Sequence, residues 1–496
     1  MRINILFGGE AGQGSNFLTH LIGQAFVKQG YFVFSSRDYQ SLIRGGHNFN
    51  VLSFSDKPIY SNDSLIDILV CLDENTEKLH KNKLKKGGII LRGDKDNVYF
   101  AGRIFKIFGF NFKILEGELK IVKKRFEENL AEAKQGYKEE KRNIKLPKIK
   151  NGVRTFINGN QGISFGAINS GLDAYYAYPM TPATSLSIEL AQKQIENNFI
   201  VLELENEIAV INAAVGSAIT GAKSMVGTSG GGFDLMAEAL SLTGIAEIGL
   251  VIFLSQRPGP GTGVATYTAQ GDLNLARHSG HGEFQRIVLA PGDPKEASEL
   301  VSQAFYFSQK YKIPIIVISD KHLGESFYTL NKKPVITNSK KSMNLTRYNS
   351  YEKNSKGNAT ENAEIIEKNI LRRKRKRIEI QKDAEKFEQY KIYGNKDSKN
   401  VIIGWGSTTG AILDAINELD VKFIQVLYIE PFQNKIKEEL KNKKIILVEN
   451  NSTGQLSNLI AEKTGIFIEE KNKILRFDGR PFLADELKKE IKKRLK

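Results

Sequence analysis

The sequence predicts an α/β protein of three domains, and three observations support this fold class. Short apolar segments of strand length alternate with longer segments of helical periodicity along most of the chain. Glycine-rich turns join many of these patterns. Two charged stretches with little apolar pattern, 127–151 and 331–398, interrupt the alternation. We therefore expect domains over 1–126, 152–330 and 399–496, separated by a charged linker and a basic excursion.

The first expected domain opens with a strand pattern at 2–7, a glycine loop at 8–14 and an apolar helix that Gly30 ends. This order is typical of a βαβ unit that binds phosphates. However, the glycines at 9, 12 and 14 do not follow the dinucleotide-binding order, and no Lys-Ser/Thr pair follows as in a P-loop. The loop alone therefore does not predict a nucleotide site.

The second expected domain carries the turn YPMTPATS at 178–185, between a strand pattern and a helix pattern. Pro179 and Pro182 fix their own φ and push the residue before each out of the helical region, so Thr181 lies on a stiff turn. We expect a hydroxyl at 184 or 185 to cap the next helix. Thr181 would then lie where open α/β sheets bind ligands. The alternative is an ordinary strand-to-helix loop.

Three acids, Glu203, Glu205 and Glu207, alternate just before a helix pattern of small apolar residues. Alternation places them on one side of an extended chain. Only Glu207 reaches the helix N-terminus, where the helix dipole favours a carboxylate. Glycine loops follow later strands at 227–232 and 255–261. Strands that alternate with helices in this way predict a doubly wound parallel sheet.

The third expected domain is smaller. Strand patterns at 401–403, 423–426 and 444–448 alternate with helical patterns, and we expect Trp405 to lie in the core or at a domain contact. In the excursion before this domain, Lys, Asn and Ser dominate, and a charged helix is expected near 365–390.

Composition excludes several classes of protein. No apolar segment is long enough to span a membrane, and the first residues lack a secretory pattern. The single cysteine, Cys71, rules out a disulfide framework and indicates a reducing, cytoplasmic location. It also means that this chain cannot supply the four thiolates of an iron–sulfur cluster. His278 and His281 have no carboxylate that completes a metal site, so no metal is expected in this chain.

The net charge of +16 comes largely from basic runs outside the patterned domains, such as 372–377. We interpret these runs first as solvated surface and second as a contact for an acidic protein. A nucleic-acid site ranks last, because no aromatic residue interrupts the run at 372–377 as a stacking platform.

Three motifs occur in one order: YPMTPATS, TSGGGFDLM at 228–236 and QRPGPGTG at 256–263. Together they resemble the alpha subunit of the 2-oxoacid:ferredoxin oxidoreductases, which depend on thiamine diphosphate. The segments GDL at 271–273, HGEF at 281–284, and ENN followed by GQL within 449–456 are similar to the same family. The N-terminal domain resembles the family's gamma subunit, through GGEAGQG, RGGH at 44–47 and PIYS at 58–61. The chain therefore looks like a gamma-alpha fusion.

The resemblance implies a fold and a site. A gamma-type α/β domain would come first, then a doubly wound domain that binds the pyrimidine half of thiamine diphosphate, then a transketolase-C-like domain. Tyr178, Pro179, Thr181 and Glu207 match cofactor-binding positions. Glu207 would share a proton with ring N1′ and so promote the imino tautomer that removes the thiazolium C2 proton. Arg257 matches the arginine that holds the substrate carboxylate, and Thr181 the threonine that hydrogen-bonds near its keto group. The alternatives are a helix cap for Glu207 and a structural ion pair for Arg257.

The resemblance also implies a reaction and partners. A 2-oxoacid such as pyruvate or 2-oxoglutarate would lose CO₂ after attack by the thiazolium ylide. Two single electrons would pass to ferredoxin through a [4Fe-4S] cluster, and coenzyme A would accept the acyl group. In the family the diphosphate, Mg²⁺ and the cluster belong to a beta subunit. We therefore expect an enzyme that is active only with its beta subunit, in an (αβ)₂ hetero-oligomer, without nucleic acid or membrane as partner.

The chain also departs from the family pattern. Met180, Ala183 and Ala269 stand where the family has isoleucine, serine and often glutamate, and the N-terminal domain is short. Indolepyruvate-type relatives carry their cluster cysteines in one long chain, and the single cysteine argues against that type. A basic nucleic-acid-binding protein and a non-catalytic scaffold are the alternative functions. Neither explains the presence of Thr181, Glu207 and Arg257 together.

Overall fold

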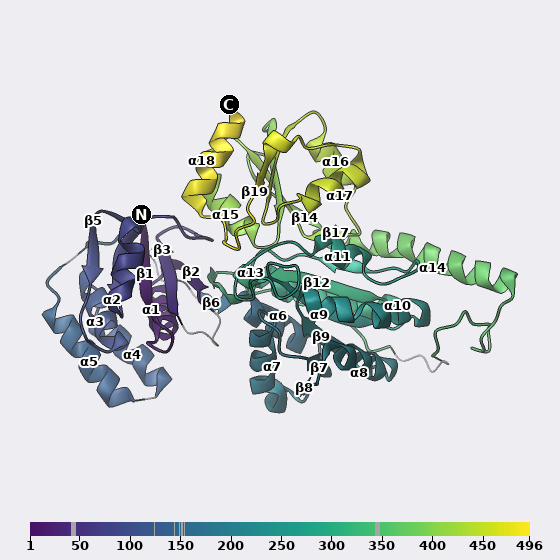
Figure 1. Ribbon diagram of the computed structural model, residues 1–496, viewed down its shortest axis with the longest axis horizontal. Coiled ribbons are helices and arrows are strands. Elements are labelled where there is room, and N and C mark those ends of the chain that lie inside the picture. The colour runs from purple at the N-terminus through teal and green to yellow at the C-terminus, as the bar shows by residue number, and fades with distance from the viewer. Residues whose placement is uncertain are drawn as a thin grey trace. The chain divides into compact units, whose positions relative to one another are not determined.

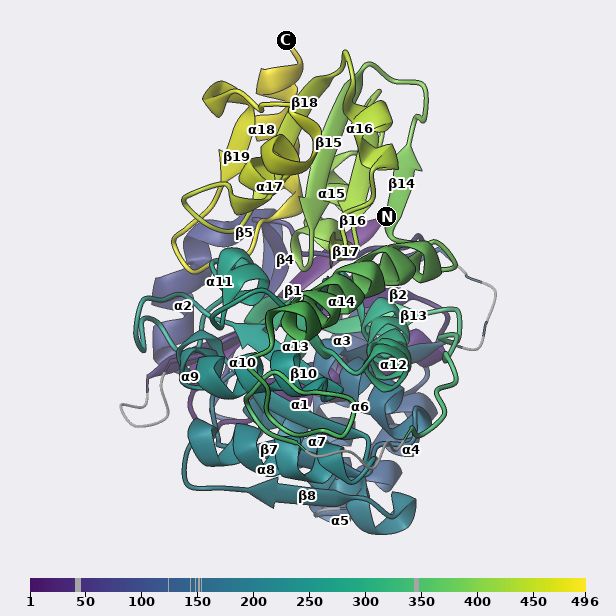
Figure 2. The ribbon, with the colours of Figure 1, turned by 90° about the vertical axis from the view of Figure 1, so that its right-hand side faces the viewer.

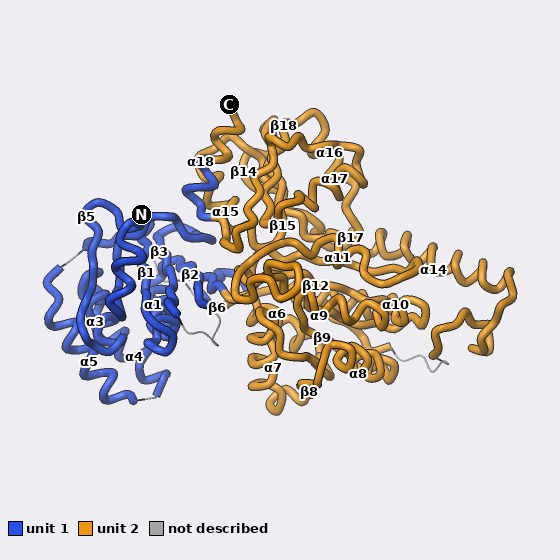
Figure 3. Tube along the Cα trace, in the orientation of Figure 1, with its two compact units in different colours: residues 1–157, 326–333, 483–489 blue, residues 158–325, 334–482, 490–496 orange. Residues whose placement is uncertain are grey.

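The computed structural model describes all residues except 41–45, 124, 143, 148, 150, 151, 153 and 343–347. Positions 44 and 45 of the glycine turn at 44–47 thus lie outside the described residues. The described chain forms two compact units (Figure 3). The first holds 1–157, 326–333 and 483–489, and the second holds 158–325, 334–482 and 490–496. Three sheets with flanking helices confirm the α/β class.

The first unit is built on a seven-stranded mixed sheet, in which Figure 1 labels β1, β2, β3, β5 and β6. The strand order is β5-β4-β1-β3-β2-β13-β6. β1 is parallel to β4 and antiparallel to β3. Alternation along β1 divides the apolar side chains between the two faces: Ile5 and Phe7 join the core under the helices, and Leu6 joins the opposite cluster. The strands are β1 (Arg2–Glu10), β2 (Phe32–Asp38), β3 (His47–Ser55), β4 (Ile66–Cys71), β5 (Leu84–Leu91), β6 (Thr155–Asn158) and β13 (Phe327–Leu330). The helices are α1 (Ser15–Lys28), α2 (Glu74–His80), α3 (Asn97–Ile107), α4 (Phe112–Val122) and α5 (Phe126–Glu139).

Two features of this unit differ from the expected domain division. α5 occupies most of the stretch that we expected to be a charged linker. It packs closely on α3, because a Cβ on Gly102 or Gly136 would overlap the backbone of the facing helix. β6 and β13 were expected in the second domain but complete the first sheet, with Phe327 and Tyr328 of β13 antiparallel to β2. Both corrections involve contacts between residues far apart in sequence, which periodicity does not encode.

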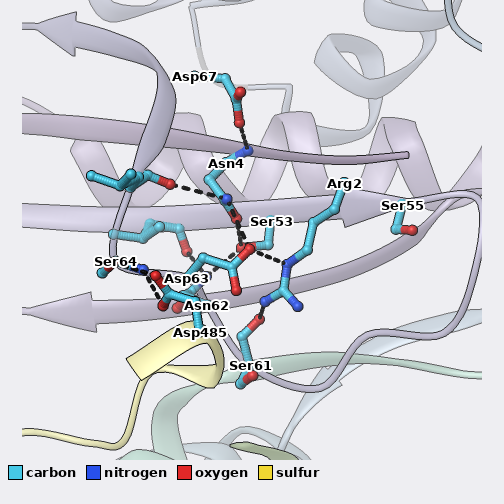
Figure 4. A network of polar contacts seen from close by, with 12 residues as sticks. Arg2, Asn4, Ser53, Ser55, Ser61, Asn62, Asp63, Ser64, Asp67 and Asp485 are labelled. Atoms are coloured by element: carbon cyan, nitrogen blue, oxygen red, sulfur yellow. Dashed lines mark hydrogen bonds and ion pairs between the residues drawn. The ribbon is translucent and has the colours of Figure 1, made fainter. Parts of the chain in front are cut away.

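A polar network holds the C-terminal segment 483–489 within the first unit (Figure 4). The backbone N–H of Ser64 donates to Oδ1 of Asp485 over 2.8 Å, and its hydroxyl donates to the other carboxylate oxygen. The N–H of Ala484 donates to the carbonyl of Asn62 over 3.0 Å. Asn62 in turn donates to the buried hydroxyl of Ser53 over 2.7 Å. The first turn of α18 (Ala484–Leu495) is thereby held to the strands of the first sheet.

The second unit contains a seven-stranded sheet with the order β17-β11-β12-β10-β9-β7-β8. Its strands are parallel except for β17, which is antiparallel to β11. Helices α6, α7 and α12 pack on one face, and helices α8 to α11 pack on the other. This is the expected doubly wound arrangement. The strands are β7 (Ala174–Ala177), β8 (Ile200–Glu203), β9 (Ser224–Thr228), β10 (Leu250–Gln256), β11 (Ile287–Leu289), β12 (Pro314–Asp320) and β17 (Tyr428–Glu430). The helices are α6 (Gly159–Asn169), α7 (Thr184–Asn197), α8 (Glu207–Ile219), α9 (Gly230–Leu235), α10 (Ala237–Ala246), α11 (Leu273–His278), α12 (Pro294–Tyr311) and α13 (Lys321–Glu325).

The third sheet has five strands in the order β14-β16-β15-β18-β19 and belongs to the same unit as the second. β14 lies in the expected excursion, yet it pairs antiparallel with β16 as an edge strand. Trp405 is fully buried at the end of β15, as predicted. The strands are β14 (Tyr390–Gly394), β15 (Asn400–Trp405), β16 (Lys422–Val426), β18 (Lys444–Glu449) and β19 (Lys473–Leu475). The helices are α15 (Thr408–Ala415), α16 (Lys435–Leu440) and α17 (Gln455–Thr464).

Amide side chains join the second and third sheets. Nε2 of the buried Gln270 donates to the carbonyl of Trp405 over 2.8 Å, and its Oε1 accepts from the N–H of Asn450 over 2.9 Å. Nδ2 of Asn451 donates to the carbonyl of Gln270 over 2.8 Å. Gln455 bonds the backbone at Gly271 and Asn274. The ENN and GQL segments thus hold the third sheet against the loop that ends in GDL.

The charged helix expected in the excursion is α14 (Ala363–Ala384), which lies beside α12 (Figure 2). Arg372 and Lys376 pair with Glu247, and Arg373 pairs with Glu352. Half of the basic run therefore neutralises acids of its own unit. The other three cations of the run, Lys374, Arg375 and Arg377, are exposed. No helix in the described parts of the chain is long and apolar enough to cross a membrane.

Candidate functional site

Four neighbouring parallel strands of the second sheet bring the predicted residues to one edge. In sheet order these strands are β10, β9, β7 and β8. Arg257 follows β10, the glycine loop follows β9, the turn with Thr181 follows β7, and Glu207 comes shortly after β8. Carboxyl ends of parallel strands meet at the same edge, which is where open α/β sheets bind ligands.

Glu207 is the first residue of α8 and has a side chain in the interior. Asn206, not Glu207, caps the helix, because its side chain accepts the N–H of Ala209 over 2.9 Å. Glu203 and Glu205 are exposed, whereas Glu207 is only 3% exposed. Among the described residues, Oε1 of Glu207 has no hydrogen-bond partner although it is buried. An unpaired buried carboxylate oxygen is costly, which points to a ligand group at this position.

The run of three glycines at the start of α9 makes room for two carboxylates. A Cβ on Gly232 would lie 2.5 Å from Oε1 of Glu207 and would overlap the hydroxyl of Thr228. A Cβ on Gly230 would lie 2.6 Å from Oδ2 of Asp272. Close approach of these acids to the helix, rather than an unusual turn, therefore explains glycine at 230 and 232.

Arg257 contacts the turn after β7 through the backbone. Its Nη1 donates to the carbonyl of Thr181 over 2.9 Å. Burial lowers the pKa of Arg257, while the negative charges of Glu207 and Asp272 act in the opposite direction. The structure thus brings Arg257, Thr181 and Glu207 into one site, in which Arg257 contacts the backbone carbonyl of Thr181. Tyr178 and Pro179 lie on the exposed part of the turn.

The expected hydroxyl cap on α7 is wrong. Ala183 occupies the N-cap position and makes no side-chain cap. The N–H groups of Ala183 and Thr184 both donate to the carbonyl of Met180, so the turn satisfies these donors by itself. Oγ of Ser185 instead accepts from Nδ2 of Asn160 over 2.6 Å, which anchors the turn to α6.

Sequence reasoning missed Asp272 as a member of the site. Asp272 precedes an apolar helix pattern, and that position favours the interpretation of a helix cap. Its carboxylate makes no cap, however, and lies against Gly230. Burial and the negative charge of Asp234 raise the pKa of Asp272 to about 6, while the positive charge of Arg257 opposes this shift. The GDL segment at 271–273 could have indicated this role, but the sequence analysis used it only as evidence of the family resemblance.

The chemistry of these groups fits the pyrimidine end of thiamine diphosphate. A buried carboxylate oxygen without a protein partner is suited to share a proton with a ring nitrogen. The site also contains the guanidinium of Arg257, which is suited to bind the carboxylate of an anionic substrate. Within the described residues, no group of three or more His, Cys, Asp or Glu side chains is arranged to hold a metal ion.

Known proteins resemble the chain along its whole length. Residues 165–396 match the family described as pyruvate flavodoxin/ferredoxin oxidoreductase, thiamine diphosphate-binding, and residues 4–98 match pyruvate ferredoxin/flavodoxin oxidoreductase. The 2-oxoacid:ferredoxin oxidoreductase subunit alpha of a Sulfolobus species is 29% identical over 620 aligned positions, covering 100% of this chain and 97% of the relative. The 2-oxoglutarate synthase subunit KorA of Methanocaldococcus jannaschii is 30% identical over 327 positions, covering 60% of this chain and 88% of the relative.

A solved structure shares the fold. It is the 2-oxoglutarate:ferredoxin oxidoreductase from Magnetococcus marinus with 2-oxoglutarate, coenzyme A and succinyl-CoA bound. The TM-score is 0.88 at 23% identity, and both chains are covered completely. The two matched segments and the relatives establish the identity of the protein at the level of the family. The chain belongs to the family of 2-oxoacid:ferredoxin oxidoreductase alpha subunits.

Proposed function

We propose that this chain is the alpha subunit of an enzyme that converts a 2-oxoacid and coenzyme A to an acyl-CoA and CO₂, and passes two electrons singly to ferredoxin. The observation that carries the proposal is the buried carboxylate of Glu207, whose Oε1 has no protein partner among the described residues. When bound, thiamine diphosphate supplies the carbon nucleophile and the electron sink for decarboxylation. Pyruvate and 2-oxoglutarate are the substrates that we propose.

The residues of the chain have separate tasks in this proposal. Glu207 holds and returns a proton at the pyrimidine ring nitrogen, and its Oε1 is available for this bond because no described residue donates to it. Arg257 binds the substrate carboxylate with a planar pair of N–H donors. Thr181, on the turn that Arg257 contacts, positions the substrate near its keto oxygen. Tyr178 and Pro179 form the exposed side of the cofactor site.

A partner chain completes the enzyme. The chain has one cysteine, so four cluster thiolates must come from elsewhere. We propose a beta subunit that carries a [4Fe-4S] cluster, Mg²⁺ and the diphosphate half of the cofactor, in an (αβ)₂ assembly that reduces ferredoxin. We also propose that 1–126 form the core of the gamma-type domain, that 152–330 without β6 and β13 form the pyrimidine-binding domain, and that 399–496 form the transketolase-C-like domain.

The test uses Glu207→Gln in the complex reconstituted with its beta subunit. Glutamine keeps the shape of the side chain but does not exchange a proton with the ring. Acceptor reduction and exchange of the C2 proton of bound cofactor should both slow by about 10²–10⁴. Glu205→Gln is the matched control, because Glu205 lies two residues away and is exposed. Wild-type exchange in Glu207→Gln would show that Glu207 does not serve the cofactor.

A further inference from the structure

Asp272 stands at a helix start but does not act as a helix cap. It occupies the N-cap position of α11, and its side chain makes no hydrogen bond there. Its backbone N–H donates to Oε1 of Gln256 over 2.9 Å. Gln256 is fully buried and is fixed in turn by its bond to the carbonyl of Ser319, over 3.0 Å. The backbone at Asp272 is therefore held firmly, while the carboxylate turns toward the glycine run.

The carboxylate of Asp272 lies against Gly230, two residues from the glycine that faces Glu207. Its two oxygens would lie 2.6 and 3.1 Å from a Cβ at position 230. The charged groups that act on it are Asp234 of α9 and Arg257 of the loop after β10. Arg257 is also acted on by Glu207. One guanidinium thus stands in the field of two carboxylates.

Two carboxylates around one arginine create a conflict with an anionic substrate. With both acids ionised, the local charge beside Arg257 is negative, and a substrate carboxylate is disfavoured. Protonation of one of the two acids removes a negative charge, so that Arg257 attracts the substrate carboxylate. Burial brings the pKa of Asp272 to about 6, so this group changes charge close to neutral pH.

We propose that Asp272 is a positioning residue that sets the charge Arg257 presents to the substrate carboxylate, and that it takes up a proton from solvent when an anionic 2-oxoacid binds. This inference rests on the proposed role of Arg257 in substrate binding. Because the bound anion favours protonated Asp272, affinity falls as pH rises above the pKa of the free site. The slope reaches about tenfold per pH unit at most, since one proton is taken up.

The experiment measures the inhibition constant of oxamate against the 2-oxoacid in the reconstituted complex, from about pH 5.5 to about pH 8.5. Oxamate shares the 2-oxo carboxylate of every 2-oxoacid and keeps one negative charge throughout this range. In the wild type the constant should rise above about pH 6. Asp272→Asn should give a nearly flat profile and tighter oxamate binding at neutral pH.

Two further variants separate this role from a structural one. Gly230→Ala keeps the carboxylate but pushes it from its place, so it should also flatten the profile. Asp234→Asn removes a neighbouring charge only, so the profile should keep its slope while its midpoint moves to lower pH. If the role of Asp272 were purely structural, Asp272→Asn would lower the melting temperature and leave the slope of the oxamate profile unchanged.

The outcomes distinguish this inference from the proposed function. If Arg257→Lys weakens oxamate binding but Asp272→Asn keeps the wild-type slope and midpoint, the role of Asp272 is refuted alone. If Arg257→Lys leaves oxamate binding unchanged, the substrate role of Arg257 fails and the inference fails with it.

Discussion

Glu449 offers a test that needs only this chain. It is fully buried at the end of β18, and its Oε1 accepts from the indole N–H of Trp405 over 2.9 Å. Both of its oxygens also accept from the N–H of Leu456 over 3.1 Å. Burial nevertheless raises the pKa of Glu449 from its ordinary value of 4.5 to about 7, because these hydrogen bonds and the charge of Lys473 offset the cost of burial only in part.

The sign of the effect follows from proton binding. Between about pH 4.5 and about pH 7 the folded chain keeps a proton on Glu449 that the unfolded chain releases. Stability therefore falls as pH rises through this window, by about 1.4 kcal/mol per pH unit. The full loss above the folded pKa is about 3 kcal/mol. Glu449→Gln stays neutral, keeps an oxygen for the Trp405 indole, and should recover most of this loss at alkaline pH.

Trp405 supplies the assay, because it is the single tryptophan of the chain. Its emission should titrate with a midpoint near pH 7 in the wild type, and this transition should be absent in Glu449→Gln. Denaturant unfolding at about pH 5 and about pH 8 should show the variant more stable than the wild type only at the higher pH. Glu469→Gln, at an exposed position, is the control and should change neither result. Equal stability of the Glu449→Gln variant and wild type at about pH 8 would refute the reasoning.

Three further predictions concern the site and the surface. Arg257→Lys keeps the charge but loses the bidentate fork, so KM for the 2-oxoacid should rise while C2-proton exchange without substrate stays normal; slowed exchange would contradict this division of roles. Gly232→Ala should lower kcat strongly and change the melting temperature little, because the new methyl group displaces the carboxylate of Glu207. Full activity of this variant would show that the contact between Gly232 and Glu207 is unimportant. Neutralising the exposed cations of α14 should leave turnover with a small dye intact, and if they contact an acidic protein, only the rate with that protein should fall, most strongly at low salt. A loss of dye turnover would contradict this surface role for Lys374, Arg375 and Arg377.

The amino-acid sequence alone was enough to predict the fold class, the family and the functional residues at the strand ends. Alternating strand and helix patterns are local, and a doubly wound sheet places every strand-to-helix turn at one edge. Thr181 and Glu207 were therefore predictable from their places after strands, whereas Arg257 was identified only through the family resemblance. The structure places the three residues after β7, β8 and β10. The three ordered motifs added the chemistry that spacing alone does not contain.

The folded structure was needed to show which long-range partners complete each helix and strand. α5 was missed because its buried Leu130 and Ala133 are sparse among charged residues, and its contact with α3 depends on glycines in both helices. β13 pairs with β2 across almost three hundred residues of sequence, as the pairing of Tyr328 with Phe34 shows. Asp272 looks like a helix cap in sequence, and it becomes a site residue only because the fold places Gly230 against it. Burial, which shifts the pKa of Asp272 and of Glu449, is a property of the packed chain, since it depends on side chains that meet only after folding.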